Sequence, residues 1–302
     1  MNESVSPAAA PNDVPTIVGG VPISERKQAR RENWRLIRRR PSFIIGMFIV
    51  AVWGACAALG ERITPHDPLD FRAKPHLSPS SDFPFGTDST GRDVLSRVMA
   101  GARDVLKIAP PAALLGVLLG VIVGMLMGYI GGWLDLILSR IVEAFLALPV
   151  VLLALLAVTT LGRSSTVVTG IVAVLFTPVV ARTVRSAVLS ERDLDYVTSA
   201  RLRGESRRFI MFREILPNVM GPIIVELTVR VGYAIFTVST LAFVGAGPPP
   251  PSPDWGAQVS DGYRVLNAGI WWTTLFPAAA IATLVIAVNL IADSVQSVLE
   301  AS

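Results

Sequence analysis

Charge is scarce in this chain and is missing altogether from long stretches of it. Charged residues make up 17% of its 302 residues, whereas soluble domains contain about 25%. Windows free of Asp, Glu, Lys and Arg cover residues 41–60, 108–134, 144–162, 164–181, 231–253 and 265–292. Each approaches or exceeds the roughly 20 helical residues that cross a bilayer. The pattern excludes a soluble enzyme, a disordered protein and a secreted disulfide scaffold, and it predicts an all-α polytopic membrane protein with six transmembrane helices.

Cysteine and histidine are almost absent. The chain has one cysteine, Cys56, and two histidines, His66 and His76. An intramolecular disulfide needs two cysteines, and so few Cys and His residues disfavour a metal site. The sequence also lacks a Gly-Lys-Ser/Thr phosphate loop, a His-Glu-x-x-His zinc motif and a Gly-x-Ser-x-Gly nucleophile elbow. We therefore expect no catalytic residue, no metal and no cofactor on this chain, and no ATP hydrolysis by it.

The N-terminal 40 residues differ from the rest in composition. Residues 1–24 are rich in Pro, Ala, Ser and Val, and we expect them to form a disordered tail. A basic run from Arg26 to Arg40 follows, directly before the first apolar window. A cleaved signal peptide would have a shorter apolar core nearer the start, and Trp53 stands where a lipoprotein cleavage site needs an aliphatic residue. We predict an uncleaved first span, with segment 1–40 followed by a membrane domain over 41–302.

Basic residues are distributed unevenly between the two sides of the predicted spans. Segments 1–41, 131–140, 182–213 and 293–302 carry 17 Lys and Arg, against 9 on the opposite side, seven of which lie in the long loop 61–107. Long loops weigh little in the positive-inside rule, so both termini are predicted to be cytoplasmic and 61–107 to be an outer loop. Of the 27 basic residues, 24 are Arg, which could suggest nucleic acid as a partner. They lie beside apolar spans, where the same rule accounts for them, and this disfavours nucleic acid.

Residues 190–217 form a polar cytoplasmic segment with a short internal pattern. Ser190 with Asp193 predicts a helix cap. Apolar side chains at Tyr196, Val197, Ala200 and Leu202 precede a helix-breaking Gly204, and Phe209, Ile210 and Phe212 restart the apolar character. We expect two short helices around a glycine turn, with an apolar face that docks into a groove on a partner protein. The alternative is an amphipathic loop at the membrane surface.

This segment resembles the EAA loop of ABC importer permeases. Ala200, Gly204, Leu216 and Pro217 stand at the spacing of that motif, while Thr198 and Ser199 replace its usual Glu-Ala and Glu214 replaces an Ile. In that family the loop is a coupling helix that sits in a groove of the ATPase subunit. The resemblance therefore implies that the membrane domain is coupled to an ATPase through six of these positions: Thr198, Ser199, Ala200, Gly204, Leu216 and Pro217.

A second resemblance narrows the family to the dipeptide, oligopeptide and nickel branch, and to subunits similar to the C-type dipeptide permease. Its strongest match is Phe85-Gly-Thr-Asp88-Ser-Thr-Gly91-Arg92-Asp93 with Arg97 and Gly101-Ala-Arg103. Further matches are Tyr129–Asp135 with Arg140, Glu143 and Pro149, then Asn218, and Phe243–Gly247 before a Pro-rich run and Trp255-Gly256. From the residues alone, the first match reads as a capped amphipathic helix with an Asp93–Arg97 pair four residues apart. A purely structural role of this helix stays open, and the Pro-rich run predicts an extended, rigid outer loop.

Charges near the membrane form two candidate ion pairs. Arg140 and Glu143 are three residues apart, and Glu226 and Arg230 are four apart, so each pair shares a helix face. Such pairs either form a gate at the inner mouth of a pore or join helices without a transport role. The glycines at 116, 120, 124 and 128 share one face as well, and their spacing favours close helix packing over a pore lining.

The resemblance implies a type I ABC importer permease in a bacterial inner membrane, in contact with lipid. It implies a homologous second permease subunit, two ATPase subunits that bind ATP and Mg²⁺, and an extracytoplasmic solute-binding protein, with transport by alternating access. The expected solutes are dipeptides or oligopeptides; nickel chelates, glutathione and haem are alternatives. A stand-alone channel or secondary carrier would need polar residues at midplane or an internal repeat, and a non-transporting scaffold would need none of the loop spacing.

Overall fold

The computed structural model describes residues 17–18, 21–22, 37–71 and 73–299. A two-residue antiparallel ladder joins β1 (Ile17–Val18) and β2 (Val21–Pro22). All other regular elements in the described part of the chain are helices, so the all-helical prediction is confirmed for the membrane domain. The disordered tail and most of the basic run predicted within residues 1–40 lie outside the described residues.

Five helices are long and apolar enough to cross a membrane: α2 (Pro41–Leu59), α3 (Val94–Ile130), α6 (Ser165–Glu191), α10 (Met220–Phe243) and α12 (Trp272–Leu299). A sixth span is formed if α4 (Gly132–Leu146) and α5 (Val150–Leu161) count as one segment, which is bent by 89°. Pro149 precedes α5 at the bend, and a proline lacks the N–H that would continue the hydrogen bonds of α4. The absence of charge in window 144–162 does not indicate where the helix is interrupted.

The bounds of three helices, α3, α6 and α10, differ from the predicted windows. The capped amphipathic helix predicted for the match around Asp93 and Arg97 is not a separate element: it is the first part of α3, which runs unbroken from Val94 through Pro110 and Pro111. Prolines are tolerated inside membrane helices because neighbouring helices and local adjustments satisfy the freed carbonyls. α6 continues beyond its window to Glu191, and α10 ends at Phe243, where a Gly- and Pro-rich loop begins.

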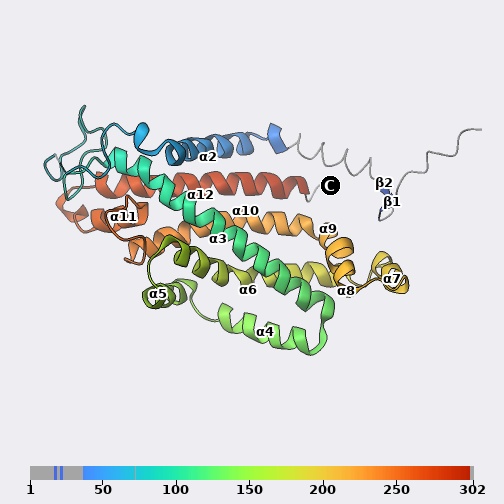
Figure 1. Cartoon of the computed structure of the whole chain (residues 1–302). Coiled ribbons are helices and arrows are strands. Elements are labelled where there is room, and N and C mark those ends of the chain that lie inside the picture. The colour runs from blue at the N-terminus through green and yellow to red at the C-terminus, as the bar shows by residue number, and fades with distance from the viewer. Residues whose placement is uncertain (1–16, 19–20, 23–36, 72, 300–302) are drawn as a thin grey trace, which may run out of the picture.

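Shorter elements collect at the two ends of the bundle (Figure 1). One end holds the loop that contains η1 (Gly60–Arg62), together with α11 (Trp255–Tyr263) and η3 (Leu266–Ala268). The opposite end holds α7 (Asp195–Leu202), α8 (Arg207–Phe209), a π-helical turn η2 (Ile210–Ile215) and α9 (Leu216–Asn218). We call these the outer and inner ends, following the predicted topology.

The glycine face of α3 packs directly on α6. A Cβ atom at Gly120 would lie 2.5 Å from Val180 Cβ, and one at Gly128 would lie 2.7 Å from Val188 Cβ. A Cβ atom at Gly116 would lie 2.9 Å from the carbonyl oxygen of Ala173 in α6, and one at Gly124 would lie 2.6 Å from that of Ala181. Small residues permit this backbone approach, and dispersion contacts between the closely packed helices stabilise it in lipid. The prediction that these glycines serve helix packing is confirmed.

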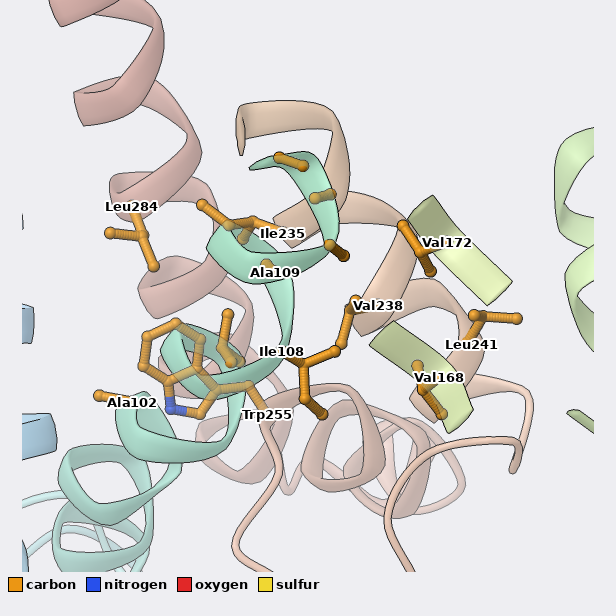
Figure 2. Close-up of a cluster of buried hydrophobic side chains, with 14 of the residues drawn as sticks. Ala102, Ile108, Ala109, Val168, Val172, Ile235, Val238, Leu241, Trp255 and Leu284 are labelled. Atoms are coloured by element: carbon orange, nitrogen blue, oxygen red, sulfur yellow. The ribbon is translucent and has the colours of Figure 1, made fainter. Parts of the chain in front are cut away.

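A buried cluster fixes the outer half of the bundle (Figure 2). Trp255 is fully buried beside Ala102 and Ile108 of α3, and its indole Nε1–H donates to the carbonyl of Val98 at 2.7 Å. Side chains from α6, α10 and α12 complete the cluster, among them Val168, Val238 and Leu284. The outer ends of four membrane helices and α11 are therefore joined in one apolar core.

Candidate functional site

The inner segment between α6 and α10 has the predicted form of two short helical pieces around a glycine. α7 ends at Leu202, and Gly204 has φ +76°, a left-handed conformation that glycine adopts without strain. The Glu205 N–H donates to the Ala200 carbonyl at 3.2 Å, which closes the turn. The cap predicted at Ser190 is wrong: α6 continues to Glu191, and the Ser190 hydroxyl donates to Ala187 O inside that helix. α7 begins after Leu194 without a side-chain cap.

One side of the inner segment is built into the membrane domain. Val197 and Ala200 are fully buried, and they form one apolar cluster with Met125 of α3 and with Val184 and Val188 of α6. Buried residues of η2 belong to the same cluster. Ala200, one of the motif positions, therefore lies inside this chain and not on its exposed face.

Polar contacts reinforce this attachment. Arg192 donates from Nη1 to Gly128 O at 3.2 Å, which ties the segment to the end of α3, and Arg201 donates to Arg192 O at 3.0 Å. The Tyr196 hydroxyl donates to a carboxylate oxygen of Glu191 at 2.7 Å. Burial, and then this hydrogen bond, raise the pKa of Tyr196 to about 12, so the hydroxyl keeps its proton at physiological pH.

The other side of the inner segment is exposed. Thr198, Ser199, Gly204 and Pro217 are exposed, and Leu202 is 85% exposed. Of the apolar residues predicted to form the partner-docking face, Val197 and Ala200 are buried inside this chain instead, whereas Leu202 is exposed. Leu216 is half-buried against the internal cluster.

Glu214, which departs from the sequence motif, has a local role. Its carboxylate pairs with Arg203 Nη2 at 3.3 Å across the glycine turn, and its carbonyl accepts from Asn218 Nδ2 at 2.9 Å. The Glu214 carboxylate therefore links the two short helical pieces through Arg203, a contact that an apolar side chain at this position could not make.

Both predicted ion pairs form, in different surroundings. Glu226 and Arg230 of α10 pair at 2.8 Å with side chains 14% and 13% exposed, and the Thr183 hydroxyl of α6 donates to the second oxygen of Glu226 at 2.7 Å. Arg140 and Glu143 of α4 pair at 2.8 Å but are 73% and 60% exposed. The first pair joins α10 to α6, whereas the second faces outward from this chain.

Sequence reasoning missed a third ion pair. Arg185 of α6 donates from Nε and Nη2 to the two carboxylate oxygens of Asp135 at 2.6 and 2.7 Å, a bidentate contact that joins α4 to α6. The two residues are 50 positions apart, so no helical spacing relates them. The one available signal was Arg185 itself, which lies in segment 182–213, predicted as a cytoplasmic loop, but belongs to α6.

At the outer end, the motif around Asp88 forms a tight turn against the start of α3. The Asp88 carboxylate accepts from the Thr90 hydroxyl at 2.7 Å and from the Arg92 backbone N–H at 3.0 Å. Burial alone would raise the pKa of Asp88, but these hydrogen bonds and the Arg92 guanidinium outweigh it and lower the pKa. Gly91 has φ +82°, and a Cβ there would overlap the carbonyl of Ala73.

The predicted Asp93–Arg97 pair is wrong. Asp93 caps α3 instead, accepting from the backbone N–H of Ser96 at 3.1 Å and from its hydroxyl at 2.5 Å. Arg97 turns the other way and lies 3.5 Å from an Asp88 oxygen. Asp93 caps α3 instead of pairing with Arg97, because the free N–H groups at the start of a helix need an acceptor that the helix itself cannot supply.

Among the described residues there is no cluster of three or more His, Cys, Asp or Glu that could hold a metal ion. The residues singled out above make structural contacts, ion pairs or an exposed face, and none forms a nucleophile–base arrangement. The described residues form a bundle of helices long and apolar enough to cross a membrane, with a helical segment at the inner end that is exposed on one side.

The chain belongs to the family of binding-protein-dependent transport system inner membrane components, whose model matches residues 120–302. It is 38% identical over 267 residues, 88% of this chain, to a putative peptide transport system permease protein of Brucella suis biovar 1, of which it covers 89%. It is 37% identical over 277 residues to the dipeptide transport system permease protein DppC of Escherichia coli K12, covering 89% of this chain and 92% of that protein. The corresponding protein of Bacillus subtilis is 35% identical over 273 residues, 89% of this chain and 85% of that protein.

Family membership settles several expectations. The chain is a multi-pass inner-membrane component, a non-catalytic subunit without a cofactor of its own. It works in a transport system that includes a binding protein and an ATPase. The predicted ABC importer permease class is confirmed.

Proposed function

We propose that this chain is one of two permease subunits of an ATP-driven importer of dipeptides or oligopeptides. Relatives that align with nearly nine tenths of the chain are named as peptide or dipeptide permeases, which supports this solute class. A homologous second permease would complete the pore, two ATPase subunits would bind at the inner end, and a solute-binding protein would bind at the outer end. Transport follows alternating access, in which ATP and solute shift the population between two states.

The inner segment carries the proposal. One of its sides is buried with α3 and α6, and the other exposes Leu202 next to Thr198, Ser199 and Gly204. An apolar side chain that is 85% exposed at the tip of a fixed helix suits a groove on a partner protein. We assign this face, with Leu216 and Pro217 behind it, to the ATPase, which makes the inner end and both termini cytoplasmic. The excess of basic residues on this side supports the same orientation.

The two predicted ion pairs receive different roles. Arg140 and Glu143 are exposed on α4, so a second permease subunit can reach them, and we assign them to a contact at the inner mouth that changes during transport. Glu226 and Arg230 are held within this chain by Thr183. We assign this pair to keeping α10 in register with α6 while the mouth opens.

The experiment is purification of the chain with the permease, ATPase and binding protein encoded beside it, followed by ATPase measurement in lipid nanodiscs. We expect a stable complex in which binding protein and dipeptide together raise ATP hydrolysis. Leu202→Asp should lose the ATPase subunits, while Leu202→Met should keep them. Stimulation by nickel chelates, glutathione or haem in place of dipeptide would reassign the solute, and uptake that survives ATP depletion would indicate a secondary carrier.

A further inference from the structure

The outer end contains a cavity with an excess of positive charge. It has a volume of about 220 Å³ and is enclosed by the start of α3, the connection between α5 and α6, the loop that follows α10, and α11. Four arginines line it: Arg92, Arg97, Arg163 and Arg264. Asp261 is the one acidic residue in the lining. We call this cavity the outer arginine pocket.

Two of the four arginines are already neutralised in part. Arg92 and Arg97 place their Nε atoms 2.7 and 3.5 Å from the same oxygen of Asp88. Arg97, which is 3% exposed, also donates to the carbonyl of Ser252 at 3.5 Å. One carboxylate thus serves two guanidinium groups at the base of the pocket.

The other two arginines have no such partner. Arg163 and Arg264 are exposed, and neither makes an ion pair or hydrogen bond with any residue that the structure describes. Asp88 and Asp261 offset two of the four arginines and Asp254 also attracts Arg97, so the charges left without a carboxylate partner are those of the exposed Arg163 and Arg264. Like charges held near one another repel, and an anion that entered would relieve this repulsion.

The walls of the pocket are fixed before any ligand arrives. The glycine- and proline-rich segment 245–251 supplies one wall, and Ser252 next to it hydrogen-bonds to the Asp104 carboxylate of α3. Gln258 of α11 donates to Pro253 O at 2.7 Å, and Trp255 anchors the same helix in the core. A preformed pocket loses little conformational entropy on binding.

We infer that the outer arginine pocket receives a carboxylate side chain of the solute-binding protein when that protein docks on the membrane subunits. This inference rests on the proposed function, in which the binding protein delivers solute at the outer end. Arginine forks bind carboxylates in a bidentate manner, and exposed arginines at the rim accelerate the encounter with an acidic surface. The solute carboxylate is a poorer occupant, because a site with four guanidinium groups would hold the solute instead of releasing it into the pore.

The test uses the complete transporter in nanodiscs and its own binding protein. The double variant Arg163→Glu/Arg264→Glu should weaken binding of that protein about ten-fold at 50 mM salt, which corresponds to about 1.4 kcal/mol. Wild-type affinity should fall steeply between 50 and 300 mM salt, and the variant should lose most of this dependence. The matched control is Arg62→Glu, which reverses an exposed arginine of η1 outside the pocket and should leave affinity unchanged.

Several outcomes would overturn the inference. Unchanged binding-protein affinity in the double variant would do so, as would a raised KM for dipeptide with that affinity intact, which would assign the pocket to the solute. Loss of the second permease from the complex would show instead that the pocket belongs to the interface between permeases. Arg163→Gln/Arg264→Gln tests the same point if the charge reversals impair folding. Failure of the proposed function looks different, because the wild-type complex would then show no stimulation by binding protein at all.

Discussion

The two ends of this molecule differ in how far their residues are buried within the chain. At the outer end, Asp93, Arg97 and Asp254 are at most 3% exposed, and their capping bonds and ion-pair contacts come largely from the chain itself. At the inner end, the segment after α6 is buried on one side and leaves Leu202 almost fully exposed on the other. The outer end has most of its polar groups satisfied within the chain and a charged opening, whereas the inner end leaves exposed the face that we assign to the ATPase. Substitutions of the buried residues at the outer end should therefore act on stability, and substitutions on the exposed face at the inner end should act on coupling.

The largest effect is expected at Gly204. A Cβ there would meet open space, so Gly204→Trp creates no clash within the chain, and its bulk projects on the exposed side of the inner segment. Transport should be abolished while the thermal stability of the purified subunit falls only slightly, by about 1–2 kcal/mol from the left-handed backbone. Gly204→Ala carries the same backbone strain without the bulk and should keep most transport. Uptake assays and thermal unfolding separate the two effects, and normal uptake by the Trp variant would refute the coupling role.

A smaller effect, this time on stability, is expected between the two ends at Glu226. Glu226→Gln leaves Arg230 without its carboxylate partner, and breaking a buried pair in this way costs about 3–5 kcal/mol. The double variant Glu226→Gln/Arg230→Met removes both charges and should be the more stable of the two. Unfolding in detergent by denaturant measures the difference. Equal destabilisation of the single and double variants would show that the pair is not coupled.

The smallest expected effect is a pH dependence of the free energy of unfolding, which comes from the buried Asp254 at the outer end. Burial raises the pKa of Asp254 to about 6, with a further upward contribution from Asp104, and one of its oxygens has no hydrogen-bond partner among the described residues. The folded protein therefore holds this proton more tightly than the unfolded chain. This group's contribution to the free energy of unfolding is fully present below about pH 4 and is lost as pH rises through 6.

Asp254→Asn isolates that contribution. Asparagine keeps the cap that Asp254 gives to the Ala257 N–H of α11 but cannot ionise. We expect the variant to be more stable than wild type at pH 7 by about 3 kcal/mol, and the two to converge near pH 4. Thermal unfolding from pH 4 to 7 measures this. A constant gap across that range would show that Asp254 does not titrate as described.

Features that depend on local spacing were predictable from the sequence. The glycines from Gly116 to Gly128 and the pair Glu226–Arg230 both follow from helical periodicity, and both form as predicted. The turn at Gly204 follows from glycine itself, which breaks a helix and adopts the left-handed conformation without strain. In each case the interacting groups share one helix face, or the residue's own backbone decides the outcome.

Features that depend on competition between partners were not predictable. Asp93 has Arg97 at the right spacing, but it is also the first acceptor available to the N–H groups of α3, and Asp88 reaches Arg97 from another direction. The Asp135–Arg185 contact joins residues that only the folded bundle brings together. The bend between α4 and α5 lies at Pro149, a residue type that interrupts helices, but the uniform hydrophobicity of this window carries no trace of the 89° angle.

The glycine contact between α3 and α6 has a mechanical consequence. Helices whose backbones touch along four successive turns cannot slide or separate without losing those contacts, so they tilt as one beam. With 37 residues at about 1.5 Å each, α3 is about 55 Å long, and each degree of tilt about one end displaces the other by about 1 Å. One end of this beam holds the inner segment through Gly128 and Arg192, and the other carries Arg97. A rotation of a few degrees at the inner end would therefore move the outer arginine pocket by about the width of an atom or two.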